Sequence, residues 1–183
     1  MIDVHCHVLP GVDDGSKNTE MSMDMIDIAY TQGIRGMVLT PHYYLGHTRE
    51  NGEAFKKIFA TFKEEVHAKY ADYELYLGNE IYWNKGVIEA LKDGRINTMN
   101  DTKYVLVEFA PAAEYSDIFD AIRSLTMAGY RPLVAHMERY HALTKQIDRV
   151  EEVCENGAIL QMNADSLVGS RFDSRVKWCR KLM

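Results

Sequence analysis

The sequence predicts an α/β fold in which short buried strands alternate with amphipathic helices. Apolar runs of strand length alternate along the chain with segments whose apolar residues recur every three or four positions. Each apolar run ends at a polar residue, and these residues recur at intervals of about 27 to 38 positions, which is one strand plus one crossover helix. Such a repeat indicates a parallel sheet that is covered on both faces and that either lies open or closes toward a barrel.

The first elements follow from hydrophobic periodicity and from glycine and proline positions. A strand over residues 1–7 is followed by a helix from about Thr19 to Gln32, which Gly33 is placed to end. A buried strand over residues 36–40 then leads into a Pro-His pair. After a polar loop over residues 45–52, a longer helix carries an apolar face made of Phe55, Ile58, Phe59, Phe62 and Val66.

The same alternation continues to the end of the sequence. Further strands are expected over residues 73–78, 104–107, 132–135 and 158–162. The polar residues that follow these strands are Glu80, Glu108, His136 and Asn163. Helices are expected around residues 87–91, 118–125 and 147–154, and residues 176–182 begin a final amphipathic helix.

Length and composition are those of an ordinary globular protein. The 183 residues fit a single domain, residues 1–183, with a sizeable core. The formal charge of −6 argues against binding to nucleic acid or to an anionic membrane, which normally needs a basic surface. No apolar run approaches the ~20 residues of a membrane-spanning helix, and no signal peptide is recognised. Three cysteines without a Cys-x-x-Cys pair are typical of reduced thiols, so a cytoplasmic location is expected.

The candidate site begins with two histidines near the amino terminus. Successive side chains of a strand point to opposite faces, so His5 and His7 share a face. A turn then leaves enough chain for Asp13 or Asp14 to fold back toward both imidazoles, and the spacing does not separate the two acids. A strand with two partly exposed histidines is the structural alternative. An imidazole pair beside a carboxylate is typical of a metal site.

The polar residues at the strand ends add further candidate ligands. In barrels of parallel strands, functional residues collect at the carboxyl ends of the strands. Taken singly, each of these residues is also explained as a structural histidine or as a helix cap. Taken together, four histidines and three carboxylates are expected on one rim: His5, His7, Asp14, His42, Glu80, Glu108 and His136.

Electrostatics favours cations within such a cluster. Two carboxylates about 4 Å apart repel by roughly 4 kcal/mol at an effective dielectric constant near 20, so three of them would cost much of a domain's ~5–15 kcal/mol stability. Mixed imidazole and carboxylate ligands suit Mn, Fe, Zn or Co better than Ca. A carboxylate such as Glu80 is suited to bridge ions about 3.5–4 Å apart. Arg139, three positions after His136, is either a phosphate-binding guanidinium or an ordinary surface arginine.

Several motifs together resemble the PHP superfamily, named for polymerase and histidinol phosphatase. The motifs are His-Cys-His, Asp-Asp-Gly-Ser, Thr-Pro-His, Gly-Asn-Glu-Ile-Tyr, Val-Glu-Phe and Ala-His-Met-Glu-Arg-Tyr. More narrowly, the chain is similar to the bacterial PHP-type tyrosine-protein phosphatases encoded with capsule and exopolysaccharide genes. This resemblance implies a distorted (β/α)7 barrel and a cluster of up to three divalent ions, with manganese preferred and Fe, Zn, Co or Mg as alternatives.

The resemblance also assigns roles by motif. It implies seven metal ligands, namely His5, His7, Asp14, His42, Glu80, Glu108 and His136, and it prefers Asp14 over Asp13 on the motif alone. It implies that Arg139 contacts the phosphate. The family closes its site with Asp-x-His on the last strand, but neither Asp165 nor Asp173 is followed by such a histidine. We therefore expect a barrel without its C-terminal strand or strands.

The expected function is metal-dependent hydrolysis of a phosphate monoester. The substrate that the resemblance implies is phosphotyrosine on a bacterial tyrosine kinase. A cysteine-dependent phosphatase is excluded, because no cysteine is followed by an arginine six positions later. Two alternatives remain open: the same chemistry on a small ester such as histidinol phosphate, and a non-catalytic chain that binds metal or kinase.

Overall fold

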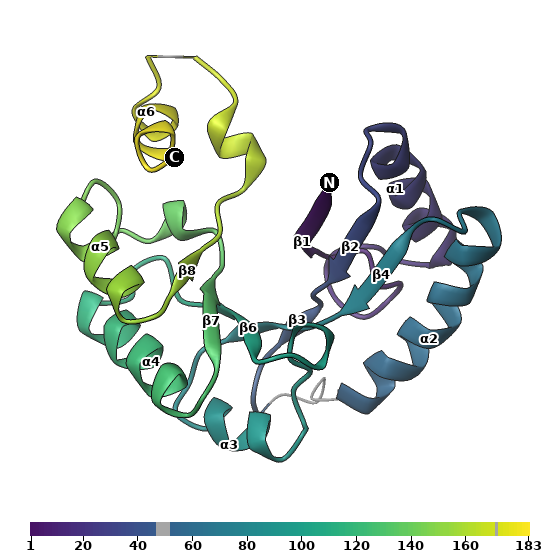
Figure 1. Cartoon of the computed structure of the whole chain (residues 1–183), viewed down its shortest axis with the longest axis horizontal. Helices are drawn as coiled ribbons and strands as arrows, with labels where there is room; N and C mark the ends of the chain where they lie inside the picture. Colours follow the sequence, from purple (N-terminus) through teal and green to yellow (C-terminus); the bar gives the residue numbers. More distant parts are fainter. Residues whose placement is uncertain (47–51, 171) are drawn as a thin grey trace. The chain divides into compact units, whose positions relative to one another are not determined.

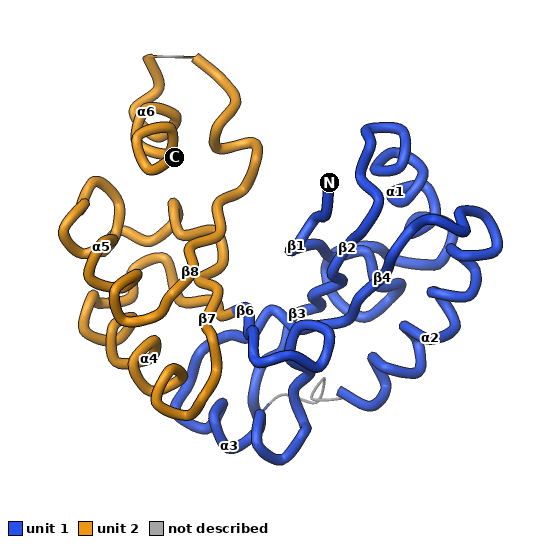
Figure 2. The backbone as a smooth tube through the Cα atoms, in the orientation of Figure 1, with its two compact units in different colours: residues 1–106 blue, residues 107–183 orange. Residues whose placement is uncertain are grey.

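The structure, a computed structural model, describes residues 1–46, 52–170 and 172–183. Helices and strands alternate along the chain, which confirms the predicted α/β class (Figure 1). The chain divides into two compact units, Met1–Leu106 and Val107–Met183, and each is described by itself below (Figure 2). That the whole chain acts as one domain stays a prediction. Residues 47–51 of the expected polar loop lie outside the described residues.

Unit 1 begins with a parallel sheet whose three strands are hydrogen bonded in the order β1-β2-β4. Its strands are β1 (Ile2–Cys6), β2 (Gly36–Leu39) and β4 (Glu74–Leu77). Helix α1 (Thr19–Thr31) connects β1 to β2, and helix α2 (Gly52–Lys69) precedes β4, as the hydrophobic periodicity predicts. The Asn18 side chain accepts a hydrogen bond from the Met21 N–H and thereby caps the start of α1.

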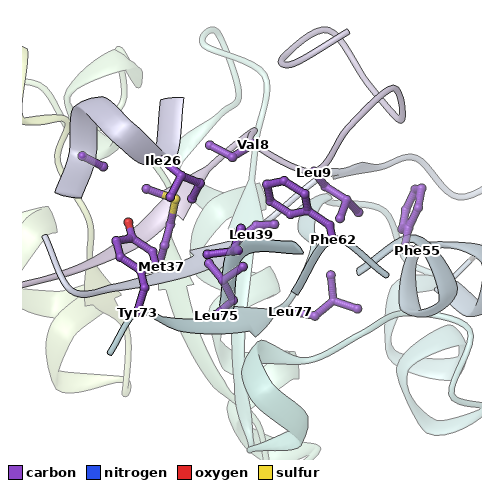
Figure 3. Packing of buried hydrophobic residues seen from close by; sticks show 12 residues of the cluster. Val8, Leu9, Ile26, Met37, Leu39, Phe55, Phe62, Tyr73, Leu75 and Leu77 are labelled. Carbon is purple, nitrogen blue, oxygen red and sulfur yellow. The ribbon is translucent and has the colours of Figure 1, made fainter. Parts of the chain in front are cut away.

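The apolar core of unit 1 is built from this sheet and these two helices (Figure 3). Leu39 and Leu75 come from the adjacent strands β2 and β4, and both are fully buried. Ile26 of α1 and Phe62 of α2 pack into the same cluster. Because Phe62 and Val66 are four positions apart, both lie on the buried face of α2. This packing fixes β1, β2 and β4, whose carboxyl ends carry the candidate ligands of unit 1.

Two very short strands follow β2 and β4, and the hydrophobic pattern of the sequence does not predict them. They are β3 (His42–Tyr43) and β5 (Glu80–Tyr82), which pair in parallel with His42 opposite Glu80. Pro41 lacks an N–H to donate to a strand ladder, so β2 and β3 do not form one continuous strand. The Asn79 side chain donates a hydrogen bond of 3.1 Å to the Pro41 carbonyl and thereby links the two interruptions.

The described strands belong to two separate sheets, of three and of five strands. Each pairing whose register is known is parallel, which confirms the predicted strand direction. Closure into a seven-stranded barrel is not confirmed, because neither sheet closes on itself within the described ranges. The physical reason is the pair of interruptions after β2 and β4, which divides the expected single sheet.

The remaining elements follow the expected alternation. Unit 1 continues with α3 (Val87–Lys92) and the 3₁₀ turn η1 (Met99–Asp101), and the boundary between the units falls within β6 (Tyr104–Glu108). Unit 2 contains the parallel strands β7 (Arg131–Val134) and β8 (Ile159–Leu160). Its helices are α4 (Tyr115–Met127), α5 (Ile147–Glu155) and α6 (Ser174–Lys181). Its 3₁₀ turns are η2 (Met137–Arg139) and η3 (Ala164–Leu167). Strand β8 is shorter than the expected strand over residues 158–162. None of the described helices combines the length and apolar character that crossing a membrane requires.

Candidate metal centre

Three histidines and one glutamate meet in unit 1, at the ends of its strands. His5 lies in β1 and His7 follows that strand directly, with the two ring centroids 5.4 Å apart. His42 and Glu80 begin β3 and β5 and lie opposite each other. They come together because β2 and β4, which precede them, are parallel neighbours. The expected convergence of these four residues is therefore present within unit 1.

The Glu80 carboxylate lies at the middle of this group. Its side chain is 1% exposed, and its Oε1 lies 3.1 Å from His5 Nε2. Its Oε2 lies 3.1 Å from His7 Nε2 and 3.1 Å from His42 Nδ1. A buried carboxylate is costly unless charged or hydrogen-bonding partners compensate for the lost hydration. In this structure the three imidazoles provide that compensation.

The separations between these donor atoms fit divalent ions. Atoms bound to one ion at about 2.1 Å lie roughly 3.0–3.4 Å apart, and the three contacts of Glu80 fall in this range. Two sets of residues in unit 1 offer ligand atoms close enough for one ion: His5, His7 and Glu80, and His7, Asp14 and His42. Because the two Glu80 oxygens contact different histidines, this carboxylate has the geometry of a bridging ligand.

The two adjacent aspartates lie in different environments. The Asp13 side chain is 4% exposed, and its Oδ2 lies 2.8 Å from His7 Nδ1. The same Oδ2 accepts a hydrogen bond from the His42 N–H, and Oδ1 accepts one from the Gly15 N–H. The Asp14 side chain is 81% exposed, and its Oδ1 lies 3.5 Å from His42 Nε2. Asp14 therefore offers a carboxylate on the solvent side, whereas Asp13 is buried against the ring nitrogen of His7 that faces away from Glu80.

These contacts shift the protonation equilibria of His7 and Asp13. Burial lowers the pKa of His7, but the hydrogen bonds to Asp13 and Glu80 outweigh it and raise the pKa to about 10. Burial raises the pKa of Asp13, but the hydrogen bond with His7 more than offsets it and keeps the pKa below its usual range. A divalent ion therefore competes with a proton for the His7 Nε2 atom.

The loop after β1 folds back tightly onto His7. The Ser16 N–H donates to the His7 carbonyl at 3.0 Å, and the Gly11 N–H donates to the Ser16 carbonyl at 2.9 Å. Gly15 approaches His7 so closely that a Cβ at this position would overlap the His7 carbonyl oxygen and Cβ atom. This close approach holds the acidic pair beside the histidines.

Unit 2 holds a second pair of candidate ligands. His136 Nε2 lies 3.3 Å from Glu108 Oε1, and the two side chains are 5% and 17% exposed. His136 has a left-handed backbone with φ of 32°, a conformation that is strained for a residue with a Cβ. Its N–H donates to Gln161 Oε1 at 2.7 Å, and its Nδ1 lies 3.4 Å from the Tyr140 hydroxyl. These contacts hold the ring with Nε2 toward Glu108.

Arg139 lies in the η2 turn that follows His136, and its side chain is exposed. The neighbouring Glu138 is buried, and its Oε1 accepts hydrogen bonds from the Asn163 N–H at 3.2 Å and from the Ser166 hydroxyl at 2.9 Å. The Arg139 N–H donates to the His136 carbonyl at 3.0 Å. Glu138 thus anchors the turn within unit 2, while the guanidinium of Arg139 stays accessible to solvent.

Comparison with known proteins identifies the family. Residues 1–183 match the family described as capsular polysaccharide synthesis, CpsB/CapC. The chain belongs to this family. It is 35% identical over 182 residues to the tyrosine-protein phosphatase CpsB of Streptococcus agalactiae serotype V (strain ATCC BAA-611 / 2603 V/R). The aligned region covers 99% of this chain and 75% of that relative. It is 30% identical over 171 residues to the tyrosine-protein phosphatase YwqE of Bacillus subtilis (strain 168), and this aligned region covers 92% of this chain and 66% of that relative.

A solved CpsB/CapC structure has the same fold. The match has a TM-score of 0.89 at 28% sequence identity and covers 100% of this chain and 74% of the solved chain. That chain comes from the crystal structures of YwqE from Bacillus subtilis and CpsB from Streptococcus pneumoniae, described as unique metal-dependent tyrosine phosphatases. The resemblance found in the sequence motifs is therefore confirmed.

In this CpsB/CapC chain, the residues that hold the candidate ligands in place are not indicated by the motifs that contain the ligands. The motif favours Asp14 over Asp13 as a ligand, but Asp followed two positions later by Gly is a turn signal that indicates that the Asp13 side chain bonds to its own loop. No pattern in the sequence indicated that Gln161 and Tyr140 contact His136, because these contacts depend on tertiary packing. Asn163, which ends an expected strand, contributes its N–H to Glu138.

Proposed function

We propose that this protein is a metal-dependent phosphate monoester hydrolase that acts on phosphotyrosine in proteins. The observation that carries the proposal is the buried Glu80 carboxylate, which three imidazoles contact at separations that fit divalent ions. The naming of relatives as tyrosine-protein phosphatases, and the description of the solved neighbour as metal-dependent, support the choice of substrate and of cofactor.

The proposed ligands are those that the sequence motifs assign. Manganese, in a cluster of up to three ions, is the ion that the family resemblance implies. The imidazole and carboxylate donors suit Mn, Fe, Zn or Co, and Fe, Zn, Co and Mg are the alternatives. When bound, such ions act as Lewis acids on the phosphate and make water a nucleophile near neutral pH. The residues proposed to hold these ions are His5, His7, Asp14, His42, Glu80, Glu108 and His136.

The proposed role of Arg139 is to bind the phosphate of the substrate. A guanidinium group donates two parallel hydrogen bonds to a pair of phosphate oxygens and neutralises part of their charge. Glu138 would hold the turn in place during this contact, because its hydrogen bonds to Asn163 and Ser166 anchor the turn through a buried side chain. Arg139 is thus proposed as a catalytic residue that touches the substrate.

The proposal extends to the partner and the setting of the reaction. The proposed protein substrate is a bacterial tyrosine kinase that regulates capsular or exopolysaccharide synthesis, which agrees with the description of the family. A cytoplasmic location is proposed because all three cysteines are unpaired thiols. A single domain and the distorted (β/α)7 barrel of the PHP superfamily are retained as proposals for the fold.

The test is phosphate release from a phosphotyrosyl peptide after chelation and metal replacement. We expect treatment with EDTA to abolish turnover and added Mn²⁺ to restore it. Histidinol phosphate, assayed in parallel, should be a much poorer substrate. Turnover that is indifferent to EDTA would overturn the proposal, and faster turnover of histidinol phosphate would overturn the substrate. Tight metal binding without hydrolysis of either compound would favour the non-catalytic alternative.

Two variants connect this assay to the site. Glu80→Gln removes the carboxylate that contacts three histidines, so we expect loss of at least about a hundredfold in turnover and weaker Mn²⁺ binding. Glu53→Gln is the matched control, because Glu53 is an exposed residue of α2 that pairs with Lys56. Equal activity of the two variants would contradict the proposed centre.

A further inference from the structure

A pocket of about 210 Å³ adjoins the candidate metal centre within unit 1. Its lining combines polar and apolar side chains: Val12, Asp13, Asp14, His42 and Tyr44. His42 belongs to the centre through its contact with Glu80, so the polar side of the pocket is continuous with the candidate ligands. Val12 and Tyr44 form apolar walls next to it.

A succession of neighbouring rings starts at the candidate metal centre and passes through His42 and Tyr44, the two aromatic residues of the pocket lining. The ring centroids of His7 and His42 lie 4.5 Å apart, those of His42 and Tyr44 lie 5.5 Å apart, and those of Tyr44 and Tyr82 lie 5.5 Å apart. These separations are within the 4.5–7 Å range over which aromatic rings attract one another. The Tyr44 ring therefore presents an aromatic surface next to His42, one of the three histidines that contact Glu80.

The position of Tyr44 is set by two neighbouring contacts. Tyr44 directly follows strand β3, which pairs with β5 so that Tyr43 lies opposite Ile81, and its ring contacts that of Tyr82. The residue after Tyr44, Leu45, packs closely against Gly86: a Cβ added at Gly86 would meet Leu45 Cδ2 at 2.5 Å. A half-buried ring held in this way loses little conformational freedom when a ligand binds against it.

We infer that Tyr44, together with Val12, forms the subsite for the aromatic ring of the substrate and selects aryl over alkyl phosphate esters. The inference rests on the proposed function, since it needs the phosphate to bind at the metal centre. In an aryl phosphate only one oxygen separates phosphorus from the ring, so the ring must occupy the space directly beside the centre. Tyr44 and Val12 offer apolar contact there, whereas the single methyl group of a methyl ester leaves most of that surface uncovered.

The experiment compares inhibitors that share the phosphorus group but differ in the ring. Inhibition constants of phenylphosphonate, methylphosphonate and inorganic phosphate are measured on the Mn²⁺-loaded protein and on Tyr44→Ala, Tyr44→Phe and Tyr104→Ala. We expect Tyr44→Ala to weaken phenylphosphonate roughly three- to tenfold, the range of one aromatic pair, and to leave methylphosphonate and phosphate unchanged. Tyr44→Phe should keep the affinity for phenylphosphonate, and Tyr104→Ala, which alters a half-buried tyrosine at the start of β6, should match the wild type.

The outcomes separate the subsite from the proposed function. If the wild type hydrolyses a phosphotyrosyl peptide but Tyr44→Ala binds phenylphosphonate equally well, the subsite is wrong and the proposed function stands. If Tyr44→Ala weakens all three inhibitors alike, the residue supports the centre as a whole and the inference of aryl selection is wrong. If the loaded wild type hydrolyses no phosphate ester, the proposed function fails and the subsite fails with it.

Discussion

Asp13 and His7 are joined by a contact of 2.8 Å between a carboxylate oxygen and the ring nitrogen Nδ1. The other ring nitrogen of His7, Nε2, lies 3.1 Å from Glu80. A carboxylate bonded to one nitrogen of an imidazole fixes the tautomer and the ring orientation, and leaves the other nitrogen to bind a metal. Because the same Asp13 oxygen accepts the His42 N–H, one buried side chain holds two of the proposed ligands.

This contact predicts that Asp13→Asn weakens metal binding without unfolding the protein. Loss of such an orienting carboxylate typically reduces metal affinity about 10- to 100-fold. The measurement is calorimetric titration of the EDTA-treated protein with Mn²⁺, together with a circular dichroism spectrum to confirm the fold. Asp93→Asn is the matched control, since Asp93 is exposed and pairs with Arg95. Wild-type affinity in Asp13→Asn would show that Asp13 does not position His7.

The sequence could predict which strands carry the candidate ligands but not which side chains hold those ligands in place. The alternation of side chains along a strand was enough to place His5 and His7 on one face, and both Nε2 atoms contact Glu80. Asp13 and Asp14 lie in a loop that has no periodicity. The turn signal Asp-x-Gly indicates that Asp13 bonds to Gly15, but the burial of its carboxylate against His7 and His42 depends on tertiary contacts. The deep burial of Glu80 likewise depends on three histidines that are distant in the sequence.

The division of the strands could not be predicted from hydrophobic patterns either. Strands β3 and β5 have only two and three residues, which is too short for a periodic signal. The long amphipathic helices were predicted well, because α2 repeats its buried positions over many turns. The 3₁₀ turn after His136 depends on the buried Glu138 and its hydrogen bonds, which no local pattern indicates.

Gly15 provides a steric test of the loop that carries the acidic pair. We expect Gly15→Ala to weaken Mn²⁺ binding and to lower thermal stability, because the new Cβ would overlap the His7 carbonyl oxygen and Cβ atom and displace the proposed ligand. Overpacking of this kind typically costs about 1–3 kcal/mol. The measurements are the unfolding temperature and a Mn²⁺ titration.

Gly78→Ala is the control for this steric test. A Cβ at Gly78 would meet its nearest neighbours, atoms of Met99, at 3.4 Å, which is ordinary van der Waals contact. We therefore expect it to be much less disruptive than Gly15→Ala. Equal effects of the two substitutions would show that the close approach of Gly15 to His7 has no special importance.

Phe62 tests the core that supports the strand ends. Its side chain is 1% exposed and packs within the apolar cluster of unit 1 (Figure 3). We expect Phe62→Ala to reduce the free energy of unfolding by about 3–5 kcal/mol, because it removes buried apolar surface and leaves a cavity. Denaturant unfolding measures the change. Phe172→Ala is the control, since Phe172 is 76% exposed, and it should change stability by no more than about 0.5 kcal/mol.

Asp27 of helix α1 contacts Lys69 at the end of helix α2 and should make the packing of these two helices dependent on pH. Its Oδ2 lies 2.7 Å from Lys69 Nζ, and its Oδ1 accepts a hydrogen bond from the Tyr70 hydroxyl at 2.9 Å. The hydrogen bond from Lys69, followed by that from Tyr70, lowers the pKa of Asp27 in the folded protein. A lowered folded-state pKa contributes stability that is present above the unfolded-state pKa of about 3.9 and is lost as the pH falls through the folded-state value.

Asp27→Asn should therefore lower the unfolding temperature at pH 7, and the difference from the wild type should shrink below about pH 4. Because Asp27 and Lys69 are partly exposed, we also expect added salt to reduce the difference. Thermal unfolding of both proteins across this pH range, at low and at high salt, makes the comparison. Asp24→Asn, an exposed residue of the same helix, is the control and should show a smaller effect. A difference that persists unchanged at acid pH would mean that Asp27 stabilises the helices through packing rather than through its charge.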